Sequence, residues 1–219
     1  MIAAFSKGFE QLSDPAARRV IWLGLFAALA VFAALWTAVG LLLANTALIA
    51  WGWLESLADL LGWLATGVFT WFLFPVVISA VILFMLDDIA KAVEARHYPH
   101  LPPPLGLALP RIVIDAIKFL AIAIALNMVL LVFLLIPPLF PFVFYGVNGY
   151  LLSREYFEMV ASRRVSSLEA RTLRKAHQGR LFISGVAIAF LLTVPVVNLL
   201  APIVATAAMV HMFESWRGA

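Results

Sequence analysis

Four long stretches of the sequence contain no Asp, Glu, Lys or Arg, and they limit the fold more than any other feature. They cover residues 20–54, 60–86, 119–153 and 181–213. A membrane-spanning helix needs about 20 mostly apolar residues, because each residue advances the helix by about 1.5 Å. Only 12% of the residues are charged, against about 25% in typical soluble domains. The sequence therefore predicts an all-α integral membrane protein with a single membrane domain over residues 1–219.

The first two runs predict long transmembrane helices. The first contains no proline and is rich in Ala, Leu and Val, which favours one helix over residues 15–50. The second predicts a transmembrane helix with a cytoplasmic extension over residues 57–98. Before them, residues 1–14 place apolar side chains at helical spacing, so we expect an amphipathic helix along the membrane surface.

Prolines interrupt the third and fourth runs near their middles. Pro137 and Pro138 break the third run, and Pro195 and Pro202 break the fourth. Proline breaks a helix because its ring clashes with the preceding turn and it has no N–H to donate. The three shortest arms that remain have 11 to 14 residues, or about 17–21 Å of helix, whereas the hydrocarbon core is about 30 Å thick.

These short arms predict two re-entrant, half-spanning helical hairpins, over residues 108–153 and 181–215. A cytoplasmic helical segment over residues 154–180 is expected to join them. Two ordinary spanning hairpins, with arms lengthened by neighbouring polar residues, are the alternative interpretation.

The positive charges predict the orientation in the membrane. All fifteen Lys and Arg lie before residue 20, within residues 91–118, within residues 154–180, or at Arg217. The segment between the first two runs holds only Glu55 and Asp59. Because basic segments stay in the cytoplasm, we expect both termini to be cytoplasmic.

Two adjacent arginines at the start of the first long helix are the main candidates for binding an anion. Ser13, Asp14 and Pro15 predict a helix start, and Arg18 and Arg19 follow. A helix N-terminus offers free N–H groups and a partial positive charge, and guanidinium groups add several donors. The alternative is that these arginines set the topology and contact lipid phosphates.

The residues around the proline breaks are predicted to form hairpin tips or to line a pore. Irregular backbone at membrane depth is tolerated only where it is buried in protein or lines a water-filled cavity. Asn148 and Asn198 follow or sit at the breaks. Their amides could pair with backbone groups that the prolines leave free, or donate to an anion in a pore, and these two roles are compatible. Arg111 is a further candidate for attracting anions.

Several function classes find no support in the sequence. Cysteine is absent, so disulfides and cysteine-bound metals are excluded. No GxSxG, HExxH or P-loop motif occurs, and the acids and histidines within residues 87–100 have no strong metal-ligand spacing. We therefore expect no enzyme activity, no cofactor and no metal. We also expect no nucleic-acid partner, because the basic segment over residues 154–180 is held against the membrane.

Motifs along nearly the whole chain resemble the sulfate permease CysZ family. The motifs are FSKGFEQLSDPAARRVIWLGL, DDIAKAVE, PRIVIDAIKFL followed by LLIPPLFP, GYLLSREYFEMVASRR, and LRKAHQGRLFISGV followed by VPVVNLLAPIVATAAMV. The resemblance implies two spanning helices, two half-spanning hairpins, membrane lipids as neighbours and a homo-oligomer. It also implies ATP-independent entry of sulfate across the bacterial inner membrane to supply cysteine biosynthesis.

By their position in the helix start, Arg18 and Arg19 match the sulfate-contacting arginines of that family. Two alternatives stay open: a non-transport membrane scaffold or lipid-interacting protein, and a transporter of another oxyanion such as sulfite, thiosulfate or molybdate.

Overall fold

The computed structural model describes residues 1–45, 52–104 and 109–218, which form helices and turns with no strand among them. The chain divides into two compact units. Pro15–Met85 forms the two-helix unit, and Met1–Asp14 together with Leu86–Ala219 forms the larger unit. The all-helical prediction is thus confirmed for the described residues.

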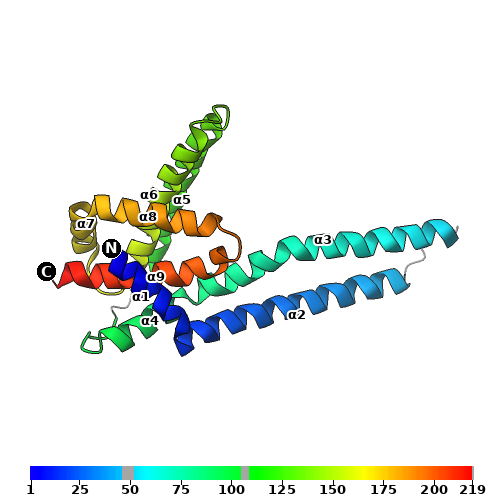
Figure 1. Ribbon diagram of the computed structural model, residues 1–219, viewed down its shortest axis with the longest axis horizontal. Helices are drawn as coiled ribbons and strands as arrows, with labels where there is room; N and C mark the ends of the chain where they lie inside the picture. The colour runs from blue at the N-terminus through cyan, green and yellow to red at the C-terminus, as the bar shows by residue number, and fades with distance from the viewer. Residues whose placement is uncertain (46–51, 105–108, 219) are drawn as a thin grey trace. The chain divides into compact units, whose positions relative to one another are not determined.

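The two-helix unit is an antiparallel pair of long helices, α2 (Pro15–Asn45) and α3 (Gly52–Phe84) (Figure 1). Aromatic rings hold the pair together: the Phe32 and Phe74 centroids lie 5.5 Å apart, and those of Trp36 and Trp63 lie 5.2 Å apart. The Trp36 Nε1–H also donates to the Thr70 hydroxyl at 3.1 Å. Stacked and tilted aromatic pairs of this kind stabilise a helix pair beyond the area they bury.

Most of the apolar surface of this unit faces outward. Only 6% of the most apolar window of α2 and 12% of that of α3 are buried, and Trp71 is 79% exposed. Such a surface would be unfavourable in water, where large apolar patches mark an interaction site or a membrane contact. Pro15–Leu42 and Leu60–Phe84 are both long and apolar enough to cross a membrane.

The larger unit is built around its last helix, α9. Its elements are α1 (Ile2–Glu10), a 3₁₀ turn η1 (Gln11–Ser13), α4 (Leu86–His97), α5 (Leu109–Phe133), α6 (Phe140–Ala161), α7 (Ser167–Ala176), α8 (Gln178–Thr193) and α9 (Val197–Arg217). Helices α1, α4, α6 and α8 all contact α9, and every residue from 201 to 214 is buried. Although α9 is apolar enough to cross a membrane, 72% of its window is covered by protein.

Helices α6 and α8 approach each other unusually closely where two glycines meet. A Cβ atom at Gly185 would clash with the carbonyl oxygen of Gly149 and would lie 2.7 Å from the Ser153 Cβ atom. A Cβ atom at Gly149 would lie 2.6 Å from a methyl group of Val186. The backbones can touch only because both positions lack a side chain, as at small-residue crossings between membrane helices.

Prolines mark the two tight turns of the larger unit. Pro137 and Pro138 lie between the end of α5 at Phe133 and the start of α6 at Phe140, and Pro195 lies between α8 and α9. Pro202, by contrast, lies inside α9. Helix α8 meets α7 at a bend of 85°, and α8 and α9 lie side by side in opposite directions (Figure 1).

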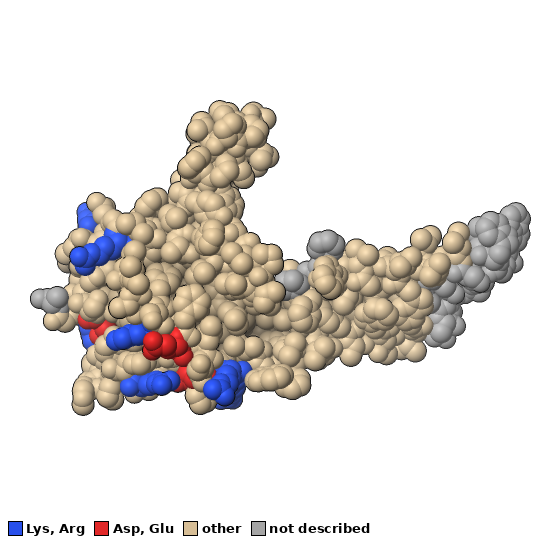
Figure 2. Space-filling model, viewed as in Figure 1, with Lys and Arg blue, Asp and Glu red and all other residues tan. Residues whose placement is uncertain are grey.

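Charged side chains of the larger unit gather at one end. In the face shown in Figure 2 they lie near α4, α7 and the two chain ends, and the protruding α5–α6 hairpin shows none. The protruding part of the hairpin (Figure 2) lies within residues 119–153, which contain no Asp, Glu, Lys or Arg. A charged end and an apolar tip are the arrangement expected when one part of a unit meets water and the other meets lipid.

Candidate functional site

The predicted anion site lies at the start of α2. This helix begins at Pro15, its first turn contains no acid, and the Arg18 and Arg19 side chains are both exposed. Successive residues are about 100° apart around a helix, so the two arginines leave it in different directions. Trp22 follows Arg18 by about one turn, which puts it on the same side of α2, and it is 55% exposed. The start of α2 therefore presents arginine side chains beside a tryptophan, a residue that is enriched at membrane–water interfaces.

The α5–α6 turn exposes Pro137 and Pro138. Asn148 does not lie in this turn but within α6, where it is half-buried. Its Nδ2 donates to the carbonyl oxygen of Phe144 at 2.9 Å. The amide donor of Asn148 is thus engaged by its own helix, and not by backbone groups that the prolines leave free.

The α8–α9 turn is strained. Val196 has φ 68° and ψ −47°, and the N–H of Val197 donates to the Pro195 carbonyl oxygen at 2.8 Å. These values describe a γ-turn of the rare positive-φ type, which is unfavourable for a β-branched residue. Strained backbone of this kind persists only where the surrounding structure holds it, and it often occurs at functional positions.

Asn198 is the polar residue nearest this turn on α9. Its backbone N–H donates to the Val194 carbonyl oxygen at 2.9 Å, but its half-buried side chain makes no hydrogen bond with the described part of the chain. Pro202, four residues later, has no N–H for the Asn198 carbonyl. The backbone carbonyl oxygen of Asn198 therefore lacks its usual helical donor. Its side-chain amide is also available to bind another group.

A second pair of polar groups lies at the same end of α8. The Tyr145 hydroxyl is 3.2 Å from the Thr193 hydroxyl, which in turn donates to the Phe190 carbonyl oxygen at 2.7 Å. This contact ties α6 to the α8–α9 turn. Tyr145, Thr193 and Asn198 together give this tip several groups that can bond to water or to an ion.

The two predicted tips are not brought together within one chain. Figure 1 shows the α5–α6 turn well apart from the α8–α9 turn. Pro137 and Pro138 thus occupy one place in the larger unit, and Pro195 and Asn198 occupy another. Arg111 lies in α5, but its side chain is outside the described residues.

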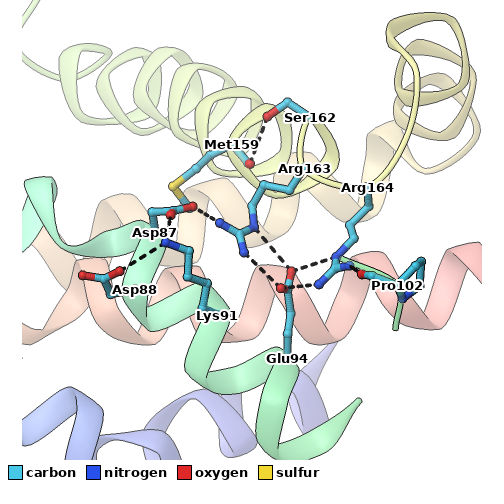
Figure 3. A network of polar contacts seen from close by, with 9 residues as sticks. All are labelled: Asp87, Asp88, Lys91, Glu94, Pro102, Met159, Ser162, Arg163 and Arg164. Carbon is cyan, nitrogen blue, oxygen red and sulfur yellow. Dashed lines mark hydrogen bonds and ion pairs between the residues drawn. The ribbon is translucent and has the colours of Figure 1, made fainter. Parts of the chain in front are cut away.

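A buried ion cluster joins α4 to the end of α6 (Figure 3). Arg163 Nη2 is 3.0 Å from Glu94 Oε2, and Arg164 Nε is 3.2 Å from Glu94 Oε1. The side chains of Arg163, Arg164 and Glu94 are only 8%, 5% and 6% exposed. Arg163 also pairs with Asp87, and Arg164 also donates to the Pro102 carbonyl oxygen.

This cluster concentrates two guanidinium groups on one buried carboxylate. Burial, and secondly the adjacent Arg164 cation, lower the pKa of Arg163 below its ordinary value. A buried charge is costly unless it is paired and hydrogen-bonded, so the two buried guanidinium groups depend on the Glu94 carboxylate as their partner. The sequence signal for it is weak: Glu94 lies one helical turn after Ala90, and only the structure shows that this side of α4 is buried.

No group of three or more histidine, aspartate or glutamate side chains is placed to hold a metal ion in the described ranges. Of the residues considered as ligands, Glu94 is paired with arginines, and Asp87 and Asp88 pair with Lys91 at 2.7 and 3.4 Å. These carboxylates are therefore already engaged in ion pairs with arginine and lysine side chains.

Comparison with known proteins supports one family. Residues 4–202 match the sequence profile of the family described as sulfate transporter CysZ/etoposide-induced protein 2.4. A search of curated proteins found no match. The family match includes residues of both units and ends at Pro202, near the start of α9.

Proposed function

The chain belongs to the sulfate transporter CysZ/etoposide-induced protein 2.4 family, and from this membership we propose that it conducts sulfate passively across the bacterial inner membrane. The family match over residues 4–202 is the observation that carries the proposal. It agrees with a chain whose apolar runs contain no acid, since proton-driven transporters usually carry ionisable groups at membrane depth. The sulfate would supply cysteine biosynthesis, and the protein itself would catalyse no reaction.

We propose that sulfate first contacts Arg18 and Arg19. Both side chains are exposed at a helix start that has no acid in its first turn. Sulfate carries two negative charges and is strongly hydrated, so a site must replace lost water with several donors. Guanidinium groups and the N–H groups of a helix N-terminus are donors of that kind.

The proposed topology places α5–α6 and α8–α9 as re-entrant hairpins that enter and leave on the cytoplasmic side, with both termini cytoplasmic. With 16 residues, α8 is about 24 Å long, which is less than the hydrocarbon thickness of about 30 Å. The 85° bend at its start turns α7 away from the direction of α8. Asn198 and the strained turn would then lie at membrane depth, where they can line a conducting path.

A pore that uses both tips requires more than one copy of the chain. The α5–α6 and α8–α9 turns lie apart in the larger unit (Figure 1), so one subunit presents each tip to a different neighbour. We therefore propose a homo-oligomer in which tips from several subunits surround the path. Membrane lipid would cover the remaining apolar surface.

Uptake of radiolabelled sulfate into liposomes that contain the purified protein tests this function. We expect saturable flux without ATP, and sulfite, thiosulfate, molybdate, phosphate and chloride as competitors define the selectivity. The double variant R18Q/R19Q should lower the flux, whereas R171Q, which also removes an exposed arginine but on α7, should not. Absence of flux from protein shown to be folded and inserted would reject the proposal, and preference for a competitor would reassign the substrate.

A second function is favoured by one specific observation. Arg18 and Trp22 lie on the same side of the start of α2, and both are exposed. A cation beside an exposed tryptophan is typical of a helix end at the lipid headgroups. A membrane scaffold that holds anionic lipid would show no sulfate flux, and its R18Q/R19Q variant would lose copurified anionic lipid in native mass spectrometry.

A further inference from the structure

A basic pocket in the larger unit lies outside the site at the start of α2. It has a volume of about 480 Å³ and is lined by Met1 and residues of α1, by His177 and Arg180 at the start of α8, by residues of α9, and by Tyr98. The side chains that give it its chemistry are Lys7, Tyr98, His177, Arg180 and His211. None of its lining residues is Asp or Glu.

The aromatic groups of the pocket are held in place by defined contacts. The His177 ring stacks on Trp216 with centroids 4.4 Å apart and planes 7° from parallel, and its Nδ1 donates to the Leu173 carbonyl oxygen at 3.1 Å. The Tyr98 hydroxyl lies 2.9 Å from His211 Nδ1. His211 is 4% exposed, and its Nε2 has no hydrogen-bond partner among the described residues.

The two cations of the pocket have no ion-pair partner among the described residues, and Glu214, whose charge acts on Tyr98, pairs instead with Arg217. Neither Lys7 nor Arg180 forms a hydrogen bond or an ion pair with the described part of the chain. The charge of Lys7 is also felt at His97, whose pKa is lowered by burial, then Arg96, then Lys7, and raised by Asp14 and Glu10. Uncompensated cations in a concave site repel each other, and an anion bound between them would remove that repulsion.

The start of α8 adds backbone donors to the same place. The helix begins at Gln178 with no side-chain cap, and its first N–H groups have no acceptor within the helix. A second cavity, of about 380 Å³, surrounds this start and shares His177 and Arg180 with the pocket. A helix N-terminus beside Arg180 is a favourable position for the oxygens of an anion.

We propose that this pocket binds a tetrahedral oxyanion, held by Lys7 and Arg180 against the start of α8. Sulfate, phosphate and the phosphate of an anionic lipid headgroup share this chemistry. The apolar side chains of Met212 and Trp216 also line the pocket, which leaves room for an organic group attached to the anion. The site is separate from Arg18 and Arg19 and does not rest on the proposed sulfate transport.

The fluorescence of Trp216, whose ring stacks on His177, can report binding of an anion in the pocket. An anion that draws His177 or Arg180 toward it should change the emission of Trp216, and the W216F variant identifies this signal among the seven tryptophans of the chain. The full chain in neutral detergent would be titrated with sulfate and with phosphate at constant ionic strength, with chloride as the balancing ion. We expect a saturable change that W216F lacks.

Matched charge removals locate the site. The K7Q/R180Q double variant should weaken binding at least about tenfold, because charge-assisted hydrogen bonds to the anion are lost. R171Q, which removes an exposed arginine outside the pocket, should keep the affinity within about twofold. The Trp216 signal reports this pocket and sulfate flux reports the start of α2, so failure of the transport site and failure of this pocket can be told apart.

The source of the oxyanion is decided in a second arm. Native mass spectrometry after exchange into phosphatidylcholine or phosphatidylglycerol nanodiscs would count retained lipids in wild type and in K7Q/R180Q. Retention of phosphatidylglycerol by wild type alone identifies a headgroup, and saturable binding of free sulfate or phosphate identifies an ion. Equal behaviour of wild type and folded K7Q/R180Q in both arms, or no binding in either, would overturn the proposal.

Discussion

Replacing Glu94 by glutamine should destabilise the larger unit strongly, because it removes the carboxylate shared by two buried guanidinium groups. Glutamine has nearly the same size, so the change is electrostatic. Arg163 would keep Asp87, whose side chain is 52% exposed, but Arg164 would keep no anionic partner among the described residues, only the Pro102 carbonyl oxygen and the uncharged amide oxygen of the new glutamine. Two adjacent, nearly buried cations would then face each other.

The magnitude follows from this loss. Removing one partner of a buried ion pair costs about 3–5 kcal/mol, because an unpaired charge stays buried. Since Asp87 still serves Arg163, we expect a value near the lower limit, about 3 kcal/mol. Each 1.4 kcal/mol is a factor of ten in an equilibrium constant, so the unfolded fraction should rise by about two orders of magnitude.

A neighbouring acid on the same helix provides the control. Asp88 is 61% exposed and lies 3.4 Å from Lys91, and exposed pairs contribute about 0–1 kcal/mol. Unfolding of E94Q, D88N and wild type would be followed by far-ultraviolet circular dichroism in one detergent as denaturant is raised. The E94Q/R164Q double variant should recover part of the loss. An E94Q protein as stable as D88N would refute the reasoning.

Four other outcomes are expected. G185A should lower the denaturation midpoint by the equivalent of about 1–3 kcal/mol, since the new methyl group overlaps the α6 backbone; an unchanged midpoint would contradict the close crossing. V196G should raise the denaturation midpoint by the equivalent of about 1 kcal/mol, because glycine tolerates φ 68°. A lower midpoint would argue against the γ-turn. The chain has no cysteine, so single-cysteine variants can test the membrane topology in intact cells. An impermeant maleimide should label S56C and should not label P138C. Labelling of both variants would favour ordinary spanning hairpins. Burial, Arg96 and Lys7 lower the pKa of His97 below 6.5, so the unfolded chain binds a proton at His97 more readily than the folded chain does. Stability in thermal unfolding should therefore fall from pH 7 to pH 5. The H97Q variant should show a weaker dependence on pH, and an equal dependence would contradict this reasoning.

Local chemistry made the helix boundaries predictable. Pro15 begins α2, and Pro137, Pro138 and Pro195 lie in the turns of the larger unit, because the missing N–H and the ring of proline act on the chain's own backbone. Pro202 shows where this argument weakens. Tertiary packing in the buried α9 keeps that proline inside a helix.

Long-range partners were not predictable from the residues alone. Glu94 meets arginines about 70 positions away, and nothing in the local pattern identifies which of several arginines will approach it. Nor does hydropathy reveal that α9 is mostly covered by protein while α2 is mostly uncovered. Lipid and a protein interior are both apolar, so both select the same side chains.

The contact between Gly149 and Gly185 restricts how the protein could open and close. With the two backbones in contact and Val186 against Gly149, α6 cannot slide along α8 without steric overlap, so the two helices must move as one rigid body. A gate in the larger unit would therefore have to open at joints that lack such interlocking. The γ-turn at Val196 is one such joint, because its strain would be released by a change of backbone angle. The contact between Gly149 and Gly185 would then keep α6 and α8 fixed relative to each other, and the γ-turn at Val196 would be the hinge about which α9 moves relative to α8.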